Sequence, residues 1–133
     1  PTALLHEVDK LRPPYNVSVL NAECALFALE HADVFAAQAQ QICDERVRLQ
    51  RDIAAINGLT PYASDANMML VRFAGASDAA AQAFEALKAR KVLVKNVSKM
   101  HPLLANCLRV TVGTPQENTQ LLAALHAIQE SQP

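Results

Sequence analysis

The stretch that decides the fold runs Asn106-Cys107-Leu108-Arg109-Val110-Thr111-Val112-Gly113-Thr114-Pro115-Gln116-Glu117-Asn118. Apolar side chains alternate with Cys107, Arg109 and Thr111 over residues 107–112, a period of two that is typical of a β-strand with one apolar face. The pattern predicts a strand that carries the Arg109 guanidinium on the face away from its apolar side. A guanidinium held there can bind a carboxylate or a phosphate through two parallel hydrogen bonds. The alternative is a surface arginine paired with an acidic side chain.

A capped helix is predicted to follow this strand directly. Gly113 breaks the alternation, and Thr114 and Glu117 make a T-x-x-E capping box. Pro115 stands at the first helical position, where its missing N–H costs no hydrogen bond. The helix then carries an apolar face made of Leu121, Leu122, Leu125 and Ile128.

Two further strands and one helix are predicted upstream. A near-continuous apolar run predicts a strand over residues 67–73, and a second apolar run predicts another over 92–97. Between them, Ser77 is expected to cap a helix that reaches about Arg90. Residues 59–65 are expected to form a turn. The apolar face of the expected helix consists of Ala80, Ala83, Phe84 and Leu87.

The N-terminal segment predicts three helices. The first covers about residues 4–11 and is ended by Pro13 and Pro14, because a residue before proline is pushed out of the helical region. Ser18 is expected to cap the second, over about residues 19–31, which is apolar on nearly all sides and therefore needs a neighbour.

Asp33 is expected to cap the third helix, which reaches about Asn57 and is followed by Gly58 in a left-handed conformation. Its apolar residues recur at alternating spacings of four and three, with Arg46 interrupting them, which allows a coiled coil but favours one long helix lying across a sheet. The residues of this seam are Phe35, Ala39, Ile42, Arg46, Leu49, Ile53 and Ile56.

The predicted order is thus helices followed by β-α-β-β-α, an α+β fold. We expect connecting helices over residues 1–60 to lead into a small domain over residues 61–133. That domain should hold a mainly antiparallel sheet with two helices on one face. The chain begins at Pro1 with no methionine, and we expect it to be cut from something longer.

Composition narrows the function classes. The 133 residues carry a net charge of −1 with 12 basic and 13 acidic side chains and no basic stripe, which argues against nucleic-acid binding. No apolar run is long enough to span a membrane. The three cysteines lack a C-x-x-C pair and the four histidines lack metal-ligand spacing, so we expect free thiols, no metal site and a cytoplasmic location.

Lys95 and Arg109 are the candidate binding residues. They lie on consecutive predicted strands joined by a short loop, for which antiparallel pairing is natural. If both project from one face, they form a two-cation site for a dianion. The alternative is two exposed basic residues on a solvated face. The sequence holds no P-loop, G-x-S-x-G or G-x-G-x-x-G motif.

Three segments resemble histidinol-phosphate aminotransferases. They are KLRPPYNVS at 10–18, DANMMLVRF at 65–73 and NCLRVTVGT at 106–114, in the order and spacing of the C-terminal part of that family. The resemblance implies a fold-type I enzyme that uses pyridoxal 5′-phosphate. It also implies amino transfer between L-histidinol phosphate and 2-oxoglutarate in histidine biosynthesis, by a homodimer acting on a small molecule.

The resemblance also implies roles for two residues. Arg109 matches the arginine that anchors the α-carboxylate of glutamate and the phosphate of histidinol phosphate. Lys95 falls where many relatives carry an arginine that contacts the phosphate, although lysine lacks the planar fork. The family's cofactor lysine, the aspartate facing the pyridine nitrogen and the stacking aromatic residue all lie upstream of position 1. We therefore expect no catalytic and no cofactor-binding residue in this chain, and no activity from it alone.

Two other interpretations remain open at the level of sequence. One is a stand-alone β-α-β-β-α module that binds a ligand or regulates. The other is a helix-mediated interaction domain, suggested by the heptad seam. A start codon directly before Pro1 would favour a module, whereas an S-x-S-K-x-x-G motif directly upstream would favour the enzyme fragment.

Overall fold

A computed structural model describes residues 2–13 and 17–130 of the chain. The chain forms two compact units, Pro1–Gln38 and Ala39–Pro133, and the division falls inside helix α3 (Ala32–Ala54). The expected boundary between connecting helices and small domain, at residue 60, stays a prediction.

The N-terminal unit is helical, as predicted. It contains α1 (Thr2–Leu11), α2 (Val19–Glu30) and the first residues of α3. The predicted cap at Ser18 is confirmed, because its Oγ accepts the Asn21 N–H at 3.1 Å. Asp33 is not a cap: α3 begins one residue earlier and places this carboxylate in its first turn, where it faces the positive end of the helix dipole. The expected break at Pro14 and link at Tyr15–Asn16 lie outside the described residues.

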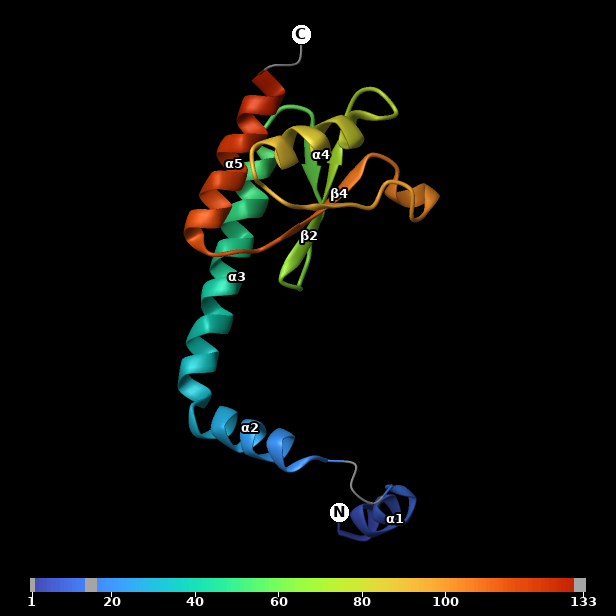
Figure 1. The fold of residues 1–133 in the computed structure, drawn as a ribbon, viewed down its shortest axis with the longest axis vertical. Coiled ribbons are helices and arrows are strands. Elements are labelled where there is room, and N and C mark those ends of the chain that lie inside the picture. The colour runs from blue at the N-terminus through green and yellow to red at the C-terminus, as the bar shows by residue number, and fades with distance from the viewer. Residues whose placement is uncertain (1, 14–16, 131–133) are drawn as a thin grey trace. The chain divides into compact units, whose positions relative to one another are not determined.

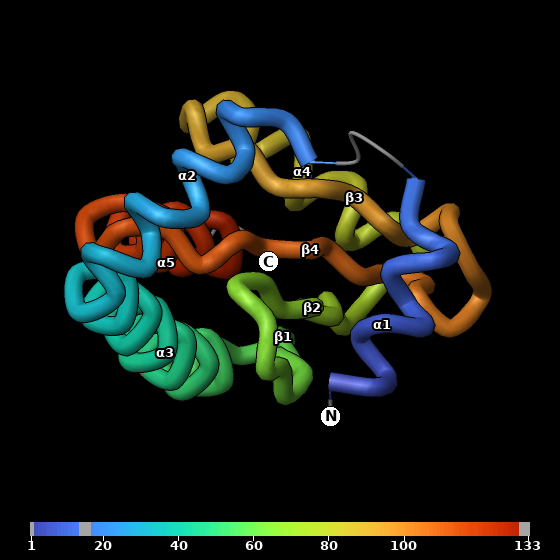
Figure 2. Tube along the Cα trace, turned by 90° about the horizontal axis from the view of Figure 1, so that it is seen from below, coloured from blue at the N-terminus to red at the C-terminus, as the bar shows by residue number. Residues whose placement is uncertain are grey.

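An antiparallel sheet with strand order β1-β2-β4-β3 forms the middle of the second unit (Figure 1, Figure 2). Its strands are β1 (Leu59–Pro61), β2 (Met68–Phe73), β3 (Lys95–Asn96) and β4 (Cys107–Thr111). The predicted strands over 67–73 and 107–112 are confirmed, and the one over 92–97 shrinks to β3. The turn expected over 59–65 is wrong at its start, which is β1. Three residues are too few for an alternation signal, and a strand containing proline is tolerated here because β1 is an edge.

Helices cover one face of this sheet. They are α4 (Ala79–Ala89), α5 (Pro115–Glu130) and the part of α3 in this unit, which runs beside α5 (Figure 1, Figure 2). We expected two helices on this face, but the α3 seam residues Leu49 and Ile53 are fully buried in the same core. Ser77 does not cap α4, which begins after Asp78 with no side-chain capping bond. The sheet residues of the core are Leu59, Met69, Val71, Phe73, Leu108, Val110 and Val112.

The predicted capping box at the start of α5 is confirmed in both directions. The Thr114 N–H donates to Glu117 Oε2 at 2.8 Å, and the Glu117 N–H donates to Thr114 Oγ1 at 3.3 Å. A side chain at Gly113 would place its Cβ 2.7 Å from the same Oε2 and 3.1 Å from Glu117 Cβ, so this turn requires glycine. At the other end of the unit, α3 ends at Ala54 and not at Asn57, while Gly58 has the expected positive φ of 79°.

Self-association is expected from the apolar surface of α2. The helix buries none of its residues, and its large apolar side chains are exposed: Leu20 by 72%, Phe27 by 56% and Leu29 by 74%. Apolar patches of this kind normally pack against a partner. We expect the isolated chain to form dimers or larger species, and Leu20→Glu combined with Phe27→Glu to shift it to monomer in multi-angle light scattering. Glu23→Gln on the same helix is the control, and a monomeric wild-type chain at high concentration would contradict the expectation.

Candidate functional site

The sheet face opposite the helices brings the two candidate residues together. Lys95 on β3 is the cross-strand partner of Arg109 on β4, and Arg109 is in turn paired with Leu70 on β2. Residues directly opposite in an antiparallel pair project to the same face, with Cβ atoms about 5 Å apart. The ammonium and the guanidinium are therefore carried side by side, as required for a two-cation site.

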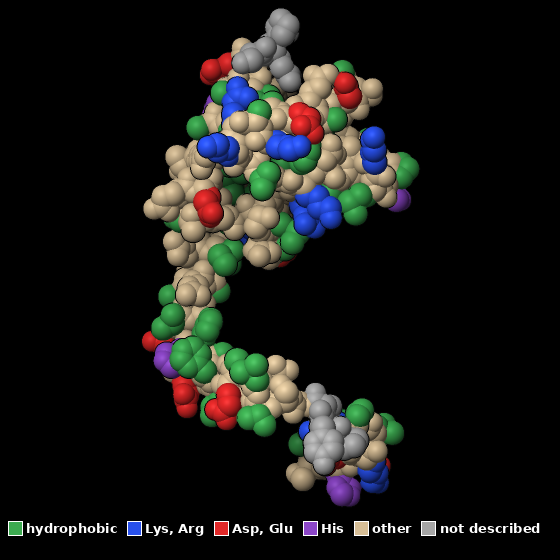
Figure 3. All heavy atoms as spheres, in the orientation of Figure 1, with side chains coloured by type: hydrophobic (Ala, Val, Ile, Leu, Met, Phe, Trp, Pro, Cys, Tyr) green, Lys and Arg blue, Asp and Glu red, His purple; other side chains and the backbone are tan. Residues whose placement is uncertain are grey.

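Neither cation is neutralised by another side chain in the part of the chain that the structure describes. Arg109 is half-buried and Lys95 is exposed. Among residues 2–13 and 17–130, neither side chain forms a hydrogen bond or an ion pair, so Arg109 lacks the acidic partner that the surface-arginine alternative requires. Figure 3 shows Lys and Arg side chains on the visible face of the second unit, with hydrophobic and acidic side chains between them. The donors of Arg109 are thus available to an anion.

Asn106 fixes the start of the strand that carries Arg109. Its backbone is left-handed, with φ of 55°, a conformation that asparagine tolerates better than most residues. Its Nδ2 donates to the Ala76 carbonyl at 2.6 Å, and its own carbonyl accepts the Phe73 N–H at 2.8 Å. Its Oδ1 accepts the Ala80 N–H at 3.4 Å, which ties β4 to the first turn of α4.

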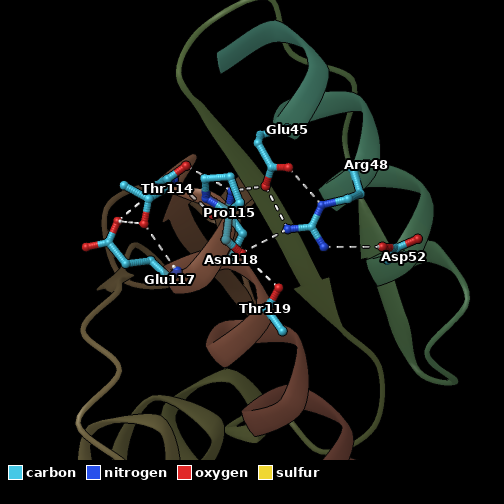
Figure 4. A network of polar contacts seen from close by, with 9 residues as sticks. Glu45, Arg48, Asp52, Thr114, Pro115, Glu117, Asn118 and Thr119 are labelled. Atoms are coloured by element: carbon cyan, nitrogen blue, oxygen red, sulfur yellow. Dashed lines mark hydrogen bonds and ion pairs between the residues drawn. The ribbon is translucent and has the colours of Figure 1, made fainter. Parts of the chain in front are cut away.

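Asn118 fixes the other end of the strand. The residue is 2% exposed, and its amide makes a closed pair of bonds with Gly113: Oδ1 accepts the N–H and Nδ2 donates to the carbonyl, each at 2.9 Å. The second hydrogen on Nδ2 goes to Glu45 Oε2 on α3 at 2.7 Å (Figure 4). Every polar atom of this buried side chain is therefore satisfied, as burial demands.

An ion pair extends this network along α3. Arg48 Nη2 lies 2.6 Å from Glu45 Oε2 and also donates to the Pro115 carbonyl at 3.3 Å, while Asp52 lies 3.9 Å from Nη1 (Figure 4). The hydrogen bond from Arg48, followed by the one from Asn118, lowers the pKa of the Glu45 carboxyl below its ordinary value. The first turn of α5 is thereby joined to α3 by charged groups as well as by apolar packing.

The sequence contained one usable signal for this network. Asn118 precedes Leu121, Leu122 and Leu125 by three, four and seven residues, so it belongs to the buried face of its helix. A polar residue on such a face must find partners, and that could have marked Asn118 in advance. Nothing comparable marks Glu45, whose spacing of three from Arg48 is common on exposed helices.

The remaining polar candidates have local structural roles. His101 Nδ1 accepts the Leu103 N–H at 3.2 Å and so caps the short 3₁₀ turn η1 (Pro102–Leu104). The Ser98 hydroxyl donates to the Cys107 carbonyl at 3.2 Å. The residues that the structure describes contain no His, Cys, Asp and Glu group suited to a metal. None of their helices is long and apolar enough to cross a membrane.

A cavity of about 370 Å³ explains the short β3. It is lined on one side by Val92–Val94 and on the other by Val110 and Thr111, so the two segments do not form a ladder where a longer strand was expected. Val110 and Leu121 in its wall belong to the helix-covered side of the sheet. Thr111, also in its wall, alternates with Val110 along β4 and therefore lies on the face that carries Arg109.

The fold is that of part of several aminotransferases and decarboxylases of known structure. The chain superposes with a TM-score of 0.78 on 35% of the histidinol-phosphate aminotransferase from Clostridium acetobutylicum, at 18% identity over 90% of this chain. It superposes with a TM-score of 0.73 on 40% of an L-threonine-O-3-phosphate decarboxylase from Porphyromonas gingivalis, at 21% identity over 98% of this chain. At these identities the likeness shows the fold alone.

Comparison of sequences gives relatives of much higher identity, all from one of these two classes. The chain is 62% identical over 125 residues to the histidinol-phosphate aminotransferase of Polaromonas naphthalenivorans, and 64% identical over 128 residues to that of Methylibium petroleiphilum. These matches cover 94% and 96% of this chain but 33% of each relative. No family model matches. The chain is a homologue of histidinol-phosphate aminotransferases and spans about a third of their length.

The Glu45–Arg48–Asn118 network predicts a pH-dependent contribution to stability. Because the folded pKa of Glu45 is lowered, its stabilisation is fully present above the unfolded value of about 4.3 and is lost as pH falls through the folded value. Glu45→Gln should therefore lower the free energy of unfolding by about 1–3 kcal/mol at neutral pH. The deficit should shrink on acidification.

Urea denaturation at pH 7 and near pH 3 measures both effects. Asp44→Asn, at the exposed neighbouring position, is the matched control and should leave the unfolding free energy nearly unchanged. An equal deficit for Glu45→Gln at the two pH values would contradict the assigned charge effect.

Proposed function

We propose that this chain is the small domain of a pyridoxal-phosphate-dependent histidinol-phosphate aminotransferase and that it binds the substrate anion there. The observation that carries the proposal is the Lys95–Arg109 pair on the open sheet face, in a homologue of those enzymes. Within residues 2–13 and 17–130 this pair has no acidic partner. The proposed reaction is amino transfer between L-histidinol phosphate and 2-oxoglutarate. The relatives favour this function over a stand-alone module or a helix-mediated interaction domain.

Arg109 is assigned the role of the shared anion anchor. Its guanidinium presents paired N–H donors whose spacing matches two oxygens of a carboxylate or of a phosphate, so one group can hold both amino donors. The strand that carries it is fixed by Asn106 at one end and Asn118 at the other. A donor that is already ordered loses less conformational freedom when the anion binds.

Lys95 is assigned to the phosphate alone. An ammonium acts as a point charge and cannot make the planar two-bond contact of a guanidinium. A phosphate dianion gains more than a carboxylate from a second cation beside Arg109, since its charge is larger. Lys95 should therefore favour histidinol phosphate over glutamate.

The cofactor's anchoring residues are assigned outside this chain. Pyridoxal phosphate, when bound, supplies the electron sink for amino transfer and needs a lysine held in a protected site. The lysines of this chain are all exposed, so none of them lies in such a protected site: Lys10, Lys88, Lys91, Lys95 and Lys99. The groups here therefore do not fit the cofactor.

The proposal also includes a homodimer, as the resemblance implies, and a cytoplasmic location, as expected from the cysteine pattern.

Replacing Arg109 tests the anchor in the full-length enzyme. Arg109→Ala should lower kcat/KM for both histidinol phosphate and glutamate by about 10- to 1,000-fold, because both anions lose the same charge-assisted contact. Lys95→Ala should lower kcat/KM for histidinol phosphate more than for glutamate. Arg90→Ala is the control, because it removes an exposed guanidinium that, among the described residues, bonds only the Ala86 carbonyl of its own helix. Small and equal effects of the first two substitutions would refute the assignment.

The isolated chain should not form a specific covalent adduct with pyridoxal phosphate. Its exposed lysines should react weakly and in proportion to accessibility. The measurement is incubation with the cofactor, reduction with borohydride and peptide mapping of the labelled sites. Stoichiometric labelling of a single lysine, above all Lys99 beside Ser98, would contradict the assignment of the cofactor site to another part of the enzyme.

A further inference from the structure

Arg72 lies on the same sheet face as Arg109 but is used differently. It is the cross-strand partner of Cys107 on β4 and of Thr60 on β1. It stands two residues from Leu70, the partner of Arg109, and alternate residues of a strand share a face. Arg72 is therefore a near neighbour of the proposed anion site on a strand that the resemblance gave no functional role.

The guanidinium of Arg72 is directed to the protein and not to solvent. Its Nη2 donates to the Leu103 carbonyl at 2.7 Å, and its central carbon lies 5.3 Å from the centre of the Tyr62 ring. Its Nε is buried and lacks a hydrogen-bond partner among the described residues. The Cys107 side chain beside it further raises the pKa of Arg72, so its charge is permanent. The Arg72 guanidinium is therefore held against the protein by the Leu103 carbonyl and the Tyr62 ring.

The Leu103 contact matters because of the segment it belongs to. Residues 98–105 connect β3 to β4, the two strands that carry Lys95 and Arg109. The other hydrogen bonds of this segment are internal or go to Asn96, Val97 and Cys107, at its own ends. Within the described residues, Arg72 makes the one hydrogen bond that ties the segment to a third strand.

β3 depends on such a tether. Its register with β4 contains only Lys95 and Asn96, and it lies at the edge of the sheet. Before it, Val92 and Val94 pack against the core, but on the far side of Asn96 the chain continues directly into residues 98–105. A ladder this short has little stability of its own. Holding residues 98–105 against the sheet therefore keeps Lys95 opposite Arg109.

We propose that Arg72 is a positioning residue for the anion site: by bonding the Leu103 carbonyl it fixes the segment over residues 98–105, and thereby the register of Lys95 against Arg109. The proposal has two halves. The functional half, that Arg72 affects anion binding, rests on the proposed function; the structural half, that Arg72 holds residues 98–105 and β3 in place, does not. Arg72 touches no substrate in this assignment and acts through β3.

Hydrogen exchange in the complete 133-residue chain tests the structural half. The reporter is the Val97 N–H, which donates to the Cys107 carbonyl at 3.2 Å, and the internal reference is the Val112 N–H, which donates to the Asn67 carbonyl at 2.8 Å. Arg72→Met should speed exchange at Val97 by about tenfold relative to Val112, because a charge-assisted bond is lost on one side only. A global loss of stability would speed both amides equally.

Arg46→Met is the matched control. Arg46 is also half-buried and also donates to backbone carbonyls of a connection between strands, those of Asp65 and Ala66 at 3.0 and 3.3 Å. It should leave the exchange of Val97 relative to Val112 unchanged. If Arg72→Met leaves this ratio at the value of the control, the proposal is overturned.

Titration with inorganic phosphate, followed by the amide signals of Lys95 and Arg109, tests the functional half. We expect Arg72→Met and Arg72→Lys each to weaken phosphate binding by about fivefold, since neither can stack on Tyr62 and bond Leu103 as the guanidinium does. Fast Val97 exchange in Arg72→Lys together with wild-type phosphate affinity would show that Arg72 acts by its charge, which overturns positioning.

The two proposals can fail separately. If the wild-type chain does not bind phosphate, or if Arg109→Gln binds it equally well, the proposed anion site is refuted. The Val97 exchange in Arg72→Met then decides by itself whether Arg72 holds β3 in register.

Discussion

The side-chain amide of Asn118 is the contact on which the rest of the second unit depends. It closes a ring with the backbone of Gly113 and reaches Glu45 on α3 with its remaining hydrogen. A buried amide that lost one of these partners would carry an unsatisfied polar group into an apolar core. Because every atom is paired, the turn between β4 and α5 can adopt only a narrow range of geometries. The direction in which Arg109 leaves the sheet follows from that turn and from Asn106 at the opposite end.

The local pattern of the sequence predicted those elements whose own residues determine them. The alternation over 107–112 and the Thr114–Glu117 box are both found as expected, and so is the Ser18 cap. The failures concern features fixed by distant residues. β1 is a strand because Leu59 pairs with Phe73, which no window of three residues can reveal. The run over 92–97 is apolar enough for a strand, but Val92–Val94 lines a cavity and joins no strand ladder among the described residues.

The residues of the candidate site likewise fall into two groups: those that local sequence patterns identified and those that depend on distant partners. Arg109 could be named from its strand pattern and Lys95 from the short loop between the strands, and the register places them side by side. The residues that hold those strands were not found in advance. Asn106, Arg72 and Glu45 act through partners 26 to 73 positions away in the chain, and such separations leave no periodic trace. Sequence patterns thus identify the groups that can meet a ligand more readily than the groups that aim them.

The crowded turn at Gly113 links two positions in evolution. A side chain at 113 would displace the Glu117 carboxylate that caps α5, and a different residue at 117 would leave the Thr114 N–H without its acceptor. Neither a side chain at 113 nor a replacement at 117 is neutral by itself. Whichever change comes first therefore lowers the stability of the fold, and the steric conflict is relieved only when the other position changes too. Variation should therefore enter these two positions as a correlated pair or not at all. An alignment of related chains would record this as covariation between positions 113 and 117.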